Sequence, residues 1–176
     1  MIKKIKVDIS VALSFNKTFR YIDDLLSMNN NDFADYVNEI YPPELELKNT
    51  TVSPTGTSYL DTTLDVGDGT QAVKSTIYDK RDDFDFTIVN FPYLDSNIPK
   101  RPAYGVYISQ LVRYARICSC KYDFTHRHQR LLSKLLKQGF QKQQLQKSFA
   151  KFYRSHFDEV KKYRATEREL QATILD

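Results

Sequence analysis

Two adjacent aspartates, Asp23 and Asp24, are the residues of this sequence best suited to chemistry. They stand between an aromatic, strand-forming segment (residues 19–22) and an apolar segment (residues 25–28). Two carboxylates at a tight turn between strands repel each other, and a hard divalent cation such as Mg²⁺ relieves that repulsion. Because Asp is also common in solvated turns, the pair alone is compatible with a metal site and with an ordinary turn.

The segment Tyr21-Ile22-Asp23-Asp24 between apolar strands resembles the catalytic hairpin of reverse transcriptases. Further motifs of that family follow in order along the chain: Ser58-Tyr59-Leu60-Asp61, Thr76-Ile77-Tyr78-Asp79-Lys80, Arg113-Tyr114-Ala115-Arg116 and Leu136-Lys137-Gln138-Gly139-Phe140. Their succession resembles the palm end and thumb of retrotransposon reverse transcriptases of the non-LTR type, most closely the Penelope-like group. The resemblance covers residues 15–163.

The resemblance implies an RNA-directed DNA polymerase that uses an RNA template, a DNA primer and Mg²⁺ or Mn²⁺. Nucleotidyl transfer requires two cations about 4 Å apart, one at the primer 3′-hydroxyl and one at the departing pyrophosphate. Asp23 corresponds to the family's shared metal ligand and Asp24 to its second, less direct carboxylate. Tyr21 and Ile22 complete the hairpin motif.

The family also uses an aspartate on an earlier palm strand, a glycine-bearing helix segment and basic residues of the fingers. About twenty residues precede the hairpin, so we expect a fragment that lacks these upstream parts and is inactive in isolation. Asp8 resembles the earlier aspartate and is a candidate metal ligand. However, Leu13 stands where the family has an aromatic residue, and the interval between Asp8 and Asp23 is too short for the intervening helix.

Charge divides the chain near residue 100. Residues 1–99 carry 9 Lys and Arg against 16 Asp and Glu, whereas residues 100–164 carry 16 against 3. An acidic half followed by a basic half suits a metal site beside a surface that binds a phosphate backbone. By resemblance to the thumb, Lys100, Arg101, Arg113 and Arg116 are expected to contact nucleic acid. The alternative function is a non-enzymatic nucleic-acid-binding module that uses the basic helical half.

We expect an α+β fold in which residues 1–99 form a partial palm of antiparallel strands and one helix. Unbroken alternation from Ile5 to Phe15 predicts a strand, and with the segments around the aspartates it predicts a three-stranded meander over residues 4–28. A helix is predicted over residues 33–40, ended by Pro42-Pro43, and a brief strand at residues 45–47. Strand-like segments at 59–66 and 72–78 around Gly67-Asp68-Gly69 predict a hairpin. Residues 79–102, with an acidic patch at Asp79, Asp82, Asp83 and Asp85, are expected to be a solvated connector.

Residues 100–176 are expected to form a basic, thumb-like bundle of three helices. The first follows Pro102, with a buried face at Tyr107, Leu111, Tyr114 and Cys118. Thr125 is expected to cap the second helix, which Gly139 ends. The third is expected to run from Gln141 to Tyr163, with Leu145, Phe149, Phe152 and Val160 turned inward.

Cys118, Cys120, His126 and His128 combine ligand types that bind zinc. Their spacing matches no zinc finger, so a core thiol with solvent-facing histidines is the preferred interpretation. Two cysteines so close in sequence predict reduced thiols in an intracellular protein of the nucleus or cytoplasm. No apolar run approaches the roughly 20 residues of a membrane span, so no membrane association is expected.

Overall fold

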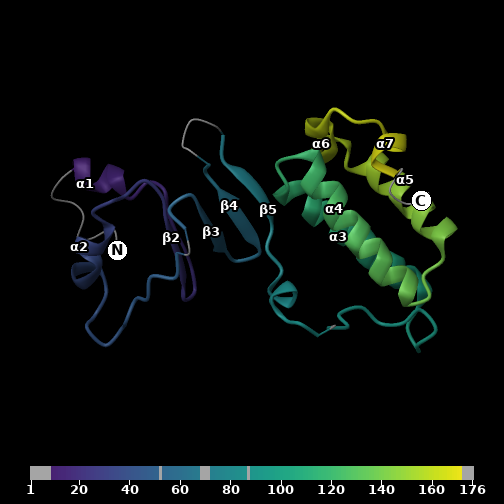
Figure 1. Ribbon diagram of the computed structural model, residues 1–176, viewed down its shortest axis with the longest axis horizontal. Coiled ribbons are helices and arrows are strands. Elements are labelled where there is room, and N and C mark those ends of the chain that lie inside the picture. Colours follow the sequence, from purple (N-terminus) through teal and green to yellow (C-terminus); the bar gives the residue numbers. More distant parts are fainter. Residues whose placement is uncertain (1–8, 52, 68–71, 87, 172–176) are drawn as a thin grey trace.

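The computed structural model describes residues 9–51, 53–67, 72–86 and 88–171. It has an α+β fold with a two-stranded antiparallel sheet, a three-stranded antiparallel sheet and a set of helices after residue 100. In Figure 1 the two sheets and the N-terminal helices lie on one side, and the helices after residue 100 lie on the other. No helix in the described ranges is long and apolar enough to cross a membrane.

The N-terminal segment contains α1 (Ile9–Ser14), β1 (Thr18–Tyr21), β2 (Asp24–Ser27) and α2 (Phe33–Ile40). The expected strand over residues 5–15 is wrong where the structure describes it, because residues 9–14 are helical. In the described part of the expected meander, residues 9–28, the strands form a two-stranded hairpin, and residues 4–8 lie outside the described residues. The amides of Phe15 and Asn16 bond back to the carbonyls of Ala12 and Leu13 (3.3 and 3.1 Å). Local hydrogen bonds thus satisfy backbone polar groups of a segment that has no neighbouring strand among the described residues.

Phe15 is the main packing residue of this segment. Its ring contacts those of Phe33 and Tyr36 on α2, with centroids 5.9 and 5.7 Å apart. The helix predicted over residues 33–40 is confirmed, and it ends before Pro42-Pro43 as expected. The strand predicted at residues 45–47 is absent, since Leu45 and Leu47 are exposed and no strand of the described chain pairs with them.

The second sheet has the order β3 (Gly56–Tyr59), β4 (Thr62–Asp65), β5 (Lys74–Ile77). The predicted hairpin is confirmed by the pairing of Thr62 with Ile77. Gly67 has a positive φ of 56° at the start of the connecting turn, which favours glycine, while Asp68 and Gly69 lie outside the described residues. Strand β3 begins three residues before the strand-like segment predicted from residue 59, because the turn at Leu60 and Asp61 returns the chain along β4.

Three long helices, α3 (Lys100–Ile117), α4 (Lys121–Lys137) and α5 (Lys142–Ser155), confirm the predicted helical composition of the second half. The predicted third helix is too long, because the chain breaks at His156 and continues as α6 (Phe157–Val160) and η2 (Lys161–Tyr163). A short α7 (Glu167–Gln171) follows. Gly139, with φ 83°, directly follows the cap of α4 as predicted.

The start of α4 corrects another expectation. The helix begins at Lys121, and the Cys120 sulfur accepts a hydrogen bond from the Asp123 amide at 3.5 Å. Thr125 lies one turn inside the helix, where its hydroxyl donates to the carbonyls of Lys121 and Tyr122. The hydroxyl therefore bonds back along the helix instead of capping it.

One continuous apolar core fills the helical half. The predicted inward residues Leu145, Phe149, Phe152 and Val160 are fully buried, as are Tyr107, Leu111 and Cys118 of the predicted α3 face. Ile77 of β5 and two residues of the connector, Phe91 and Leu94, join the same core. The last strand of the second sheet is therefore packed onto the helices.

The connector between β5 and α3 is less solvated than expected. It contains η1 (Lys80–Asp83), where the Asp82 carboxylate accepts bonds from Arg127 and Arg130 of α4 at 2.6 and 2.5 Å. Partial burial would raise the pKa of Asp82, but the two guanidinium groups outweigh that effect and lower it. Through Asp82, the acidic patch is thus joined to α4 by ion pairs.

Candidate functional site

The aspartate pair lies in the turn between β1 and β2. Tyr21 pairs with Asp24, so Ile22 and Asp23 form the two residues of a tight hairpin turn. Ile22 adopts a positive φ of 51°, which is uncommon for a β-branched side chain. The Arg20 guanidinium donates to the Ile22 carbonyl at 2.9 Å and thereby stabilises the turn. Asp23 and Asp24 are both exposed at this tip.

The hairpin exposes apolar side chains as well as carboxylates. Phe19, Tyr21 and Ile22 are each about half or more exposed, and Ile22 reaches 73%. A two-stranded sheet with so little apolar cover is marginally stable in water. Exposed apolar side chains that are close together in this way are typical of a surface that packs against another protein segment.

The two carboxylates are chemically suited to a cation but do not complete a site by themselves. Oxygen ligands match Mg²⁺ and Mn²⁺. Within the described part of the chain, no group of three His, Cys, Asp or Glu side chains gathers in a way that could hold a metal ion. Asp8, the candidate upstream ligand, lies outside the described residues.

The four cations expected to contact nucleic acid all lie on α3. Lys100 and Arg101 are exposed at the start of the helix. Arg113 is bound to Asp61 of the β3–β4 turn, with 2.8 Å between Nε and Oδ2. Arg116 is bound to Glu159 of α6, with 2.9 Å between Nε and Oε1. Sequence reasoning missed both carboxylates, because they are 52 and 43 residues away from their partners and no local pattern links them.

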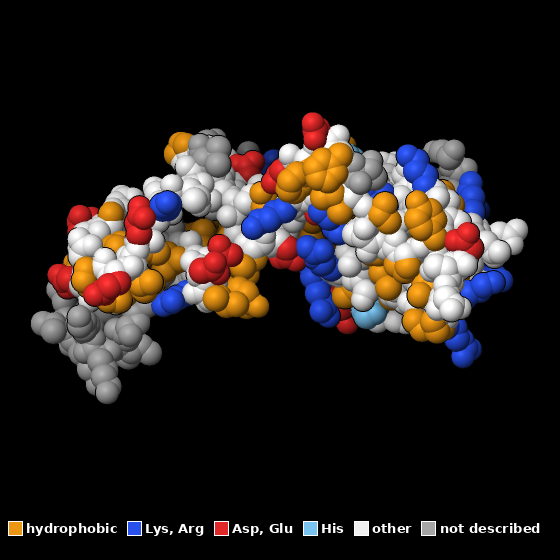
Figure 2. All heavy atoms as spheres, turned by 90° about the horizontal axis from the view of Figure 1, so that it is seen from below, with side chains coloured by type: hydrophobic (Ala, Val, Ile, Leu, Met, Phe, Trp, Pro, Cys, Tyr) orange, Lys and Arg blue, Asp and Glu red, His pale blue; other side chains and the backbone are white. Residues whose placement is uncertain are grey.

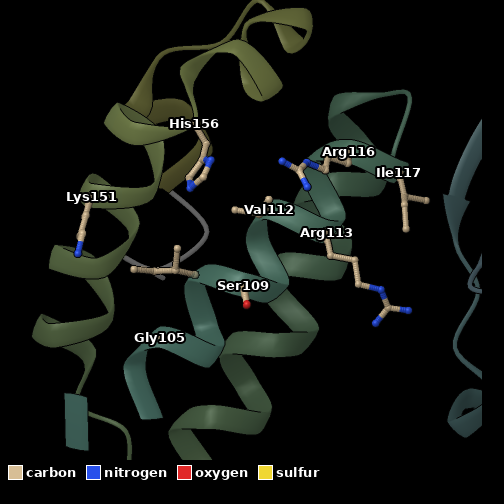
Figure 3. Close-up of a pocket in the computed structure, with 9 residues that line it drawn as sticks. Gly105, Ser109, Val112, Arg113, Arg116, Ile117, Lys151 and His156 are labelled. Carbon is tan, nitrogen blue, oxygen red and sulfur yellow. The ribbon is translucent and has the colours of Figure 1, made fainter. Parts of the chain in front are cut away.

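A groove of about 590 Å³ lies on the surface beside α3 and the end of α5. Ile108, Val112 and Ile117 supply apolar lining, and Gly105 leaves room beside Ser109. Lys151 of α5 and His156 lie across the groove from the α3 residues, and Arg113 points away from it toward the sheet (Figure 3). Lys151 and His156 were not among the predicted site residues.

The cysteines and histidines do not gather into a zinc site in the structure. His128 is fully buried, and its Nε2 lies 2.7 Å from the Tyr107 hydroxyl, so the expectation that it faces solvent is wrong. Burial lowers the pKa of His128 to about 3, because the charged imidazolium would lose its hydration. Burial likewise raises the pKa of the Cys118 thiol. His126 is exposed and stacks on Tyr122.

No protein-family model, curated protein or solved structure matches this chain.

Proposed function

We propose that this chain supplies the catalytic hairpin and the duplex-binding helices of a retroelement RNA-directed DNA polymerase, with residues 1–99 as part of its palm and residues 100–176 as its thumb. The observation that carries the proposal is the register of β1 and β2. It puts Asp23 in a two-residue turn and Asp24 at the first position of the returning strand. Two adjacent carboxylates are thereby presented at an exposed, conformationally restricted tip.

In this proposal Asp23 and Asp24 would hold Mg²⁺ through their carboxylate oxygens. When bound, the metal supplies the positive charge that favours ionisation of the primer 3′-hydroxyl and stabilises the leaving pyrophosphate. The protein's contribution is to hold the two carboxylates in a fixed relation through the β1–β2 pairing and the Arg20 bond to the turn. Further oxygen ligands come from Asp8 or from a palm segment outside this sequence.

The exposed apolar residues of the hairpin support its placement in a larger active site. Phe19 and Ile22 would be shielded from water when the tip packs against the remaining palm. The hairpin lacks apolar cover, and the carboxylate pair lacks further metal ligands. One neighbouring palm segment could supply both. We therefore expect no templated DNA synthesis from this chain alone.

The helical half provides the charge for an RNA template paired with a DNA primer. Figure 2 shows Lys and Arg side chains spread over the helical half, whereas several acidic side chains lie over the other end of the molecule. Lys100 and Arg101 are exposed and available for phosphate contacts. Arg113 and Arg116 can make such contacts only by exchanging a carboxylate for a phosphate.

Primer extension by this chain joined to the upstream palm and fingers of a reverse transcriptase tests the catalytic proposal. Asp23→Asn keeps the side-chain shape but removes the charge that binds the cation, so synthesis should be abolished. Asp24→Asn should reduce synthesis less. Asp35→Asn, an exposed carboxylate on α2, is the matched control and should leave synthesis unchanged. Near-normal turnover with Asp23→Asn would refute the metal-ligand assignment.

A second candidate function is a nucleic-acid-binding module without catalysis. It is favoured by the continuous core of the helical half, which includes no residue of β1 or β2. If the joined polymerase is inactive while the chain alone binds duplex, this second function is the better description.

A further inference from the structure

Helix α5 carries a basic stripe on the face opposite the core. Lys147, Lys151 and Arg154 are exposed and recur at intervals of four and three residues, which places them in one row along a helix. Their opposite face is the buried one, with Leu145, Phe149 and Phe152. The helix Lys142–Ser155 contains no acidic residue, so its exposed row is uniformly positive.

The cations of this α5 stripe differ from the arginines of α3 in their partners. Arg113 and Arg116 each bond a carboxylate at less than 3 Å. In the described ranges no carboxylate forms an ion pair with Lys147, Lys151 or Arg154, and the Arg154 Nε bonds the Ala150 carbonyl within its own helix. An unpaired cation binds a phosphate without first giving up a carboxylate, so the three cations of the α5 stripe are better placed to bind phosphates than Arg113 and Arg116.

The groove beside the stripe indicates the form of the anionic partner. Its lining combines small or aliphatic side chains with Ser109, His156 and cations, and it contains no Asp, Glu, Phe, Tyr or Trp. Sequence-tolerant binding of single strands uses aromatic side chains on which bases stack. The groove has one aromatic ring, the His156 imidazole, and so offers no series of rings for successive bases. Beside a row of cations, it fits a stacked duplex that presents its sugar-phosphate surface.

We propose that the α5 stripe, Lys147, Lys151 and Arg154, is a phosphate-binding track for an RNA–DNA duplex that lies across the groove between α3 and α5. The row spans about 10 Å along the helix, over which one strand presents about three phosphates. Lys151, which lines the groove and belongs to the stripe, connects the two surfaces. The choice of an RNA–DNA duplex rests on the proposed function, whereas the choice of α5 rests on its charges.

The test measures binding of the full chain to a fluorescent RNA–DNA duplex of about 16 base pairs at several salt concentrations. The variant combines Lys147→Gln, Lys151→Gln and Arg154→Gln. Each phosphate contact contributes about 0.9 to the slope of log affinity against log salt, so the slope should flatten by about two to three. The control combines Lys137→Gln, Lys162→Gln and Arg164→Gln, which removes the same charge from exposed positions elsewhere in the helical half and should flatten the slope by less than about one.

Circular dichroism melting of both variants checks that they fold like the parent chain. Equal loss from the two variants would overturn the α5 track and leave non-specific attraction. Unchanged binding by the α5 variant would also overturn it, while the proposed duplex-binding function would stand. If the parent chain binds the RNA strand alone, or a polyglutamate peptide, as tightly as the duplex, the assigned partner is wrong. If the parent chain binds none of these probes, duplex binding by the helical half fails together with the track.

Discussion

The segment from α1 to α2 and the helical half differ in how much of their structure they support themselves. In the described N-terminal segment the buried apolar residues are Phe15 and Tyr41, and Ile9 is 80% exposed. In the helical half, aromatic and aliphatic side chains from several helices and β5 share one core. The candidate catalytic carboxylates thus lie on the weakly packed part and the proposed nucleic-acid surface on the strongly packed part. We infer that the helical half is preformed and that the hairpin depends on packing against another segment.

The largest expected effect is a core truncation in the helical half. Phe149 is fully buried and its ring stacks on His128 with centroids 5.0 Å apart. Phe149→Ala should lower the free energy of unfolding by about 3–5 kcal/mol, measured by urea denaturation. The matched change in the hairpin, Phe19→Ala, should cost less than about 1 kcal/mol, since this ring is half exposed. Similar costs at the two positions would break the comparison.

The helical half should also lose stability in acid because of His128. Burial lowers the pKa of this imidazole to about 3 in the folded chain, against about 6.5 when unfolded. Below pH 6.5 the unfolded state binds the additional proton, so stability should fall by about 1.4 kcal/mol per pH unit as the pH decreases toward 3. Urea denaturation between about pH 4 and 7 measures this slope.

Two histidine variants make the acid experiment specific. His128→Phe should flatten the pH dependence, although it gives up the bond to Tyr107. His126→Gln changes an exposed imidazole and should leave the slope as it is. A parent chain whose stability is level over this range would contradict the assignment of His128 as a buried neutral base.

The sequence predicted those features that depend on residues close together in the chain. The end of α4 at Gly139 and the tight turn at Asp23 follow from local backbone preferences, and the apolar spacing of α5 predicts its buried face. Predictions were wrong where the local structure depends on residues distant in sequence. Alternation at residues 5–15 predicts a strand only if a sheet lies beside it, and α1 has no such neighbour in the described chain.

The polar contacts of the site were the least predictable part. His128 has an ordinary local sequence, and only the packing of Tyr107, Phe124 and Phe149 around it makes it a core residue. Arg113 and Arg116 lie outside the core, but their carboxylate partners come from a β-turn and from α6, which no local pattern indicates. Charge composition predicts a basic surface without indicating which cations are already paired.

Asp82 provides a smaller test, because it joins the segment between β5 and α3 to the helices. Asp82→Asn removes a carboxylate that bonds both Arg127 and Arg130. We expect a loss of about 1–3 kcal/mol, the range for hydrogen bonds to charged groups that are partly buried. Asp85→Asn, at an exposed position of the same connector, should cost less than about 0.5 kcal/mol. Equal and small losses would indicate that the connector is solvated after all.

The smallest expected effect concerns Arg113 and Asp61, which join the β3–β4 turn to α3. Both side chains are partly exposed, so a double-mutant cycle with Arg113→Gln and Asp61→Asn should give a coupling of about 0.2–1 kcal/mol. Arg113→Gln by itself should flatten the salt dependence of duplex binding less than the α5 variant does. Arg113 would instead belong to the nucleic-acid surface if two results are found together. Arg113→Gln would flatten the slope of log affinity against log salt by about 0.9, the value for one phosphate contact, and it would show no coupling to Asp61.

Localised backbone cleavage tests the central claim, that Asp23 and Asp24 bind the catalytic cation, without relying on turnover. In the chain joined to an upstream palm and fingers, Fe²⁺ replaces Mg²⁺, and with ascorbate and hydrogen peroxide it cuts the backbone beside its binding site. The account predicts cuts within residues 21–25, suppressed by excess Mg²⁺ and abolished in Asp23→Asn but not in Asp35→Asn. Mg²⁺-sensitive cuts confined to other segments would contradict it.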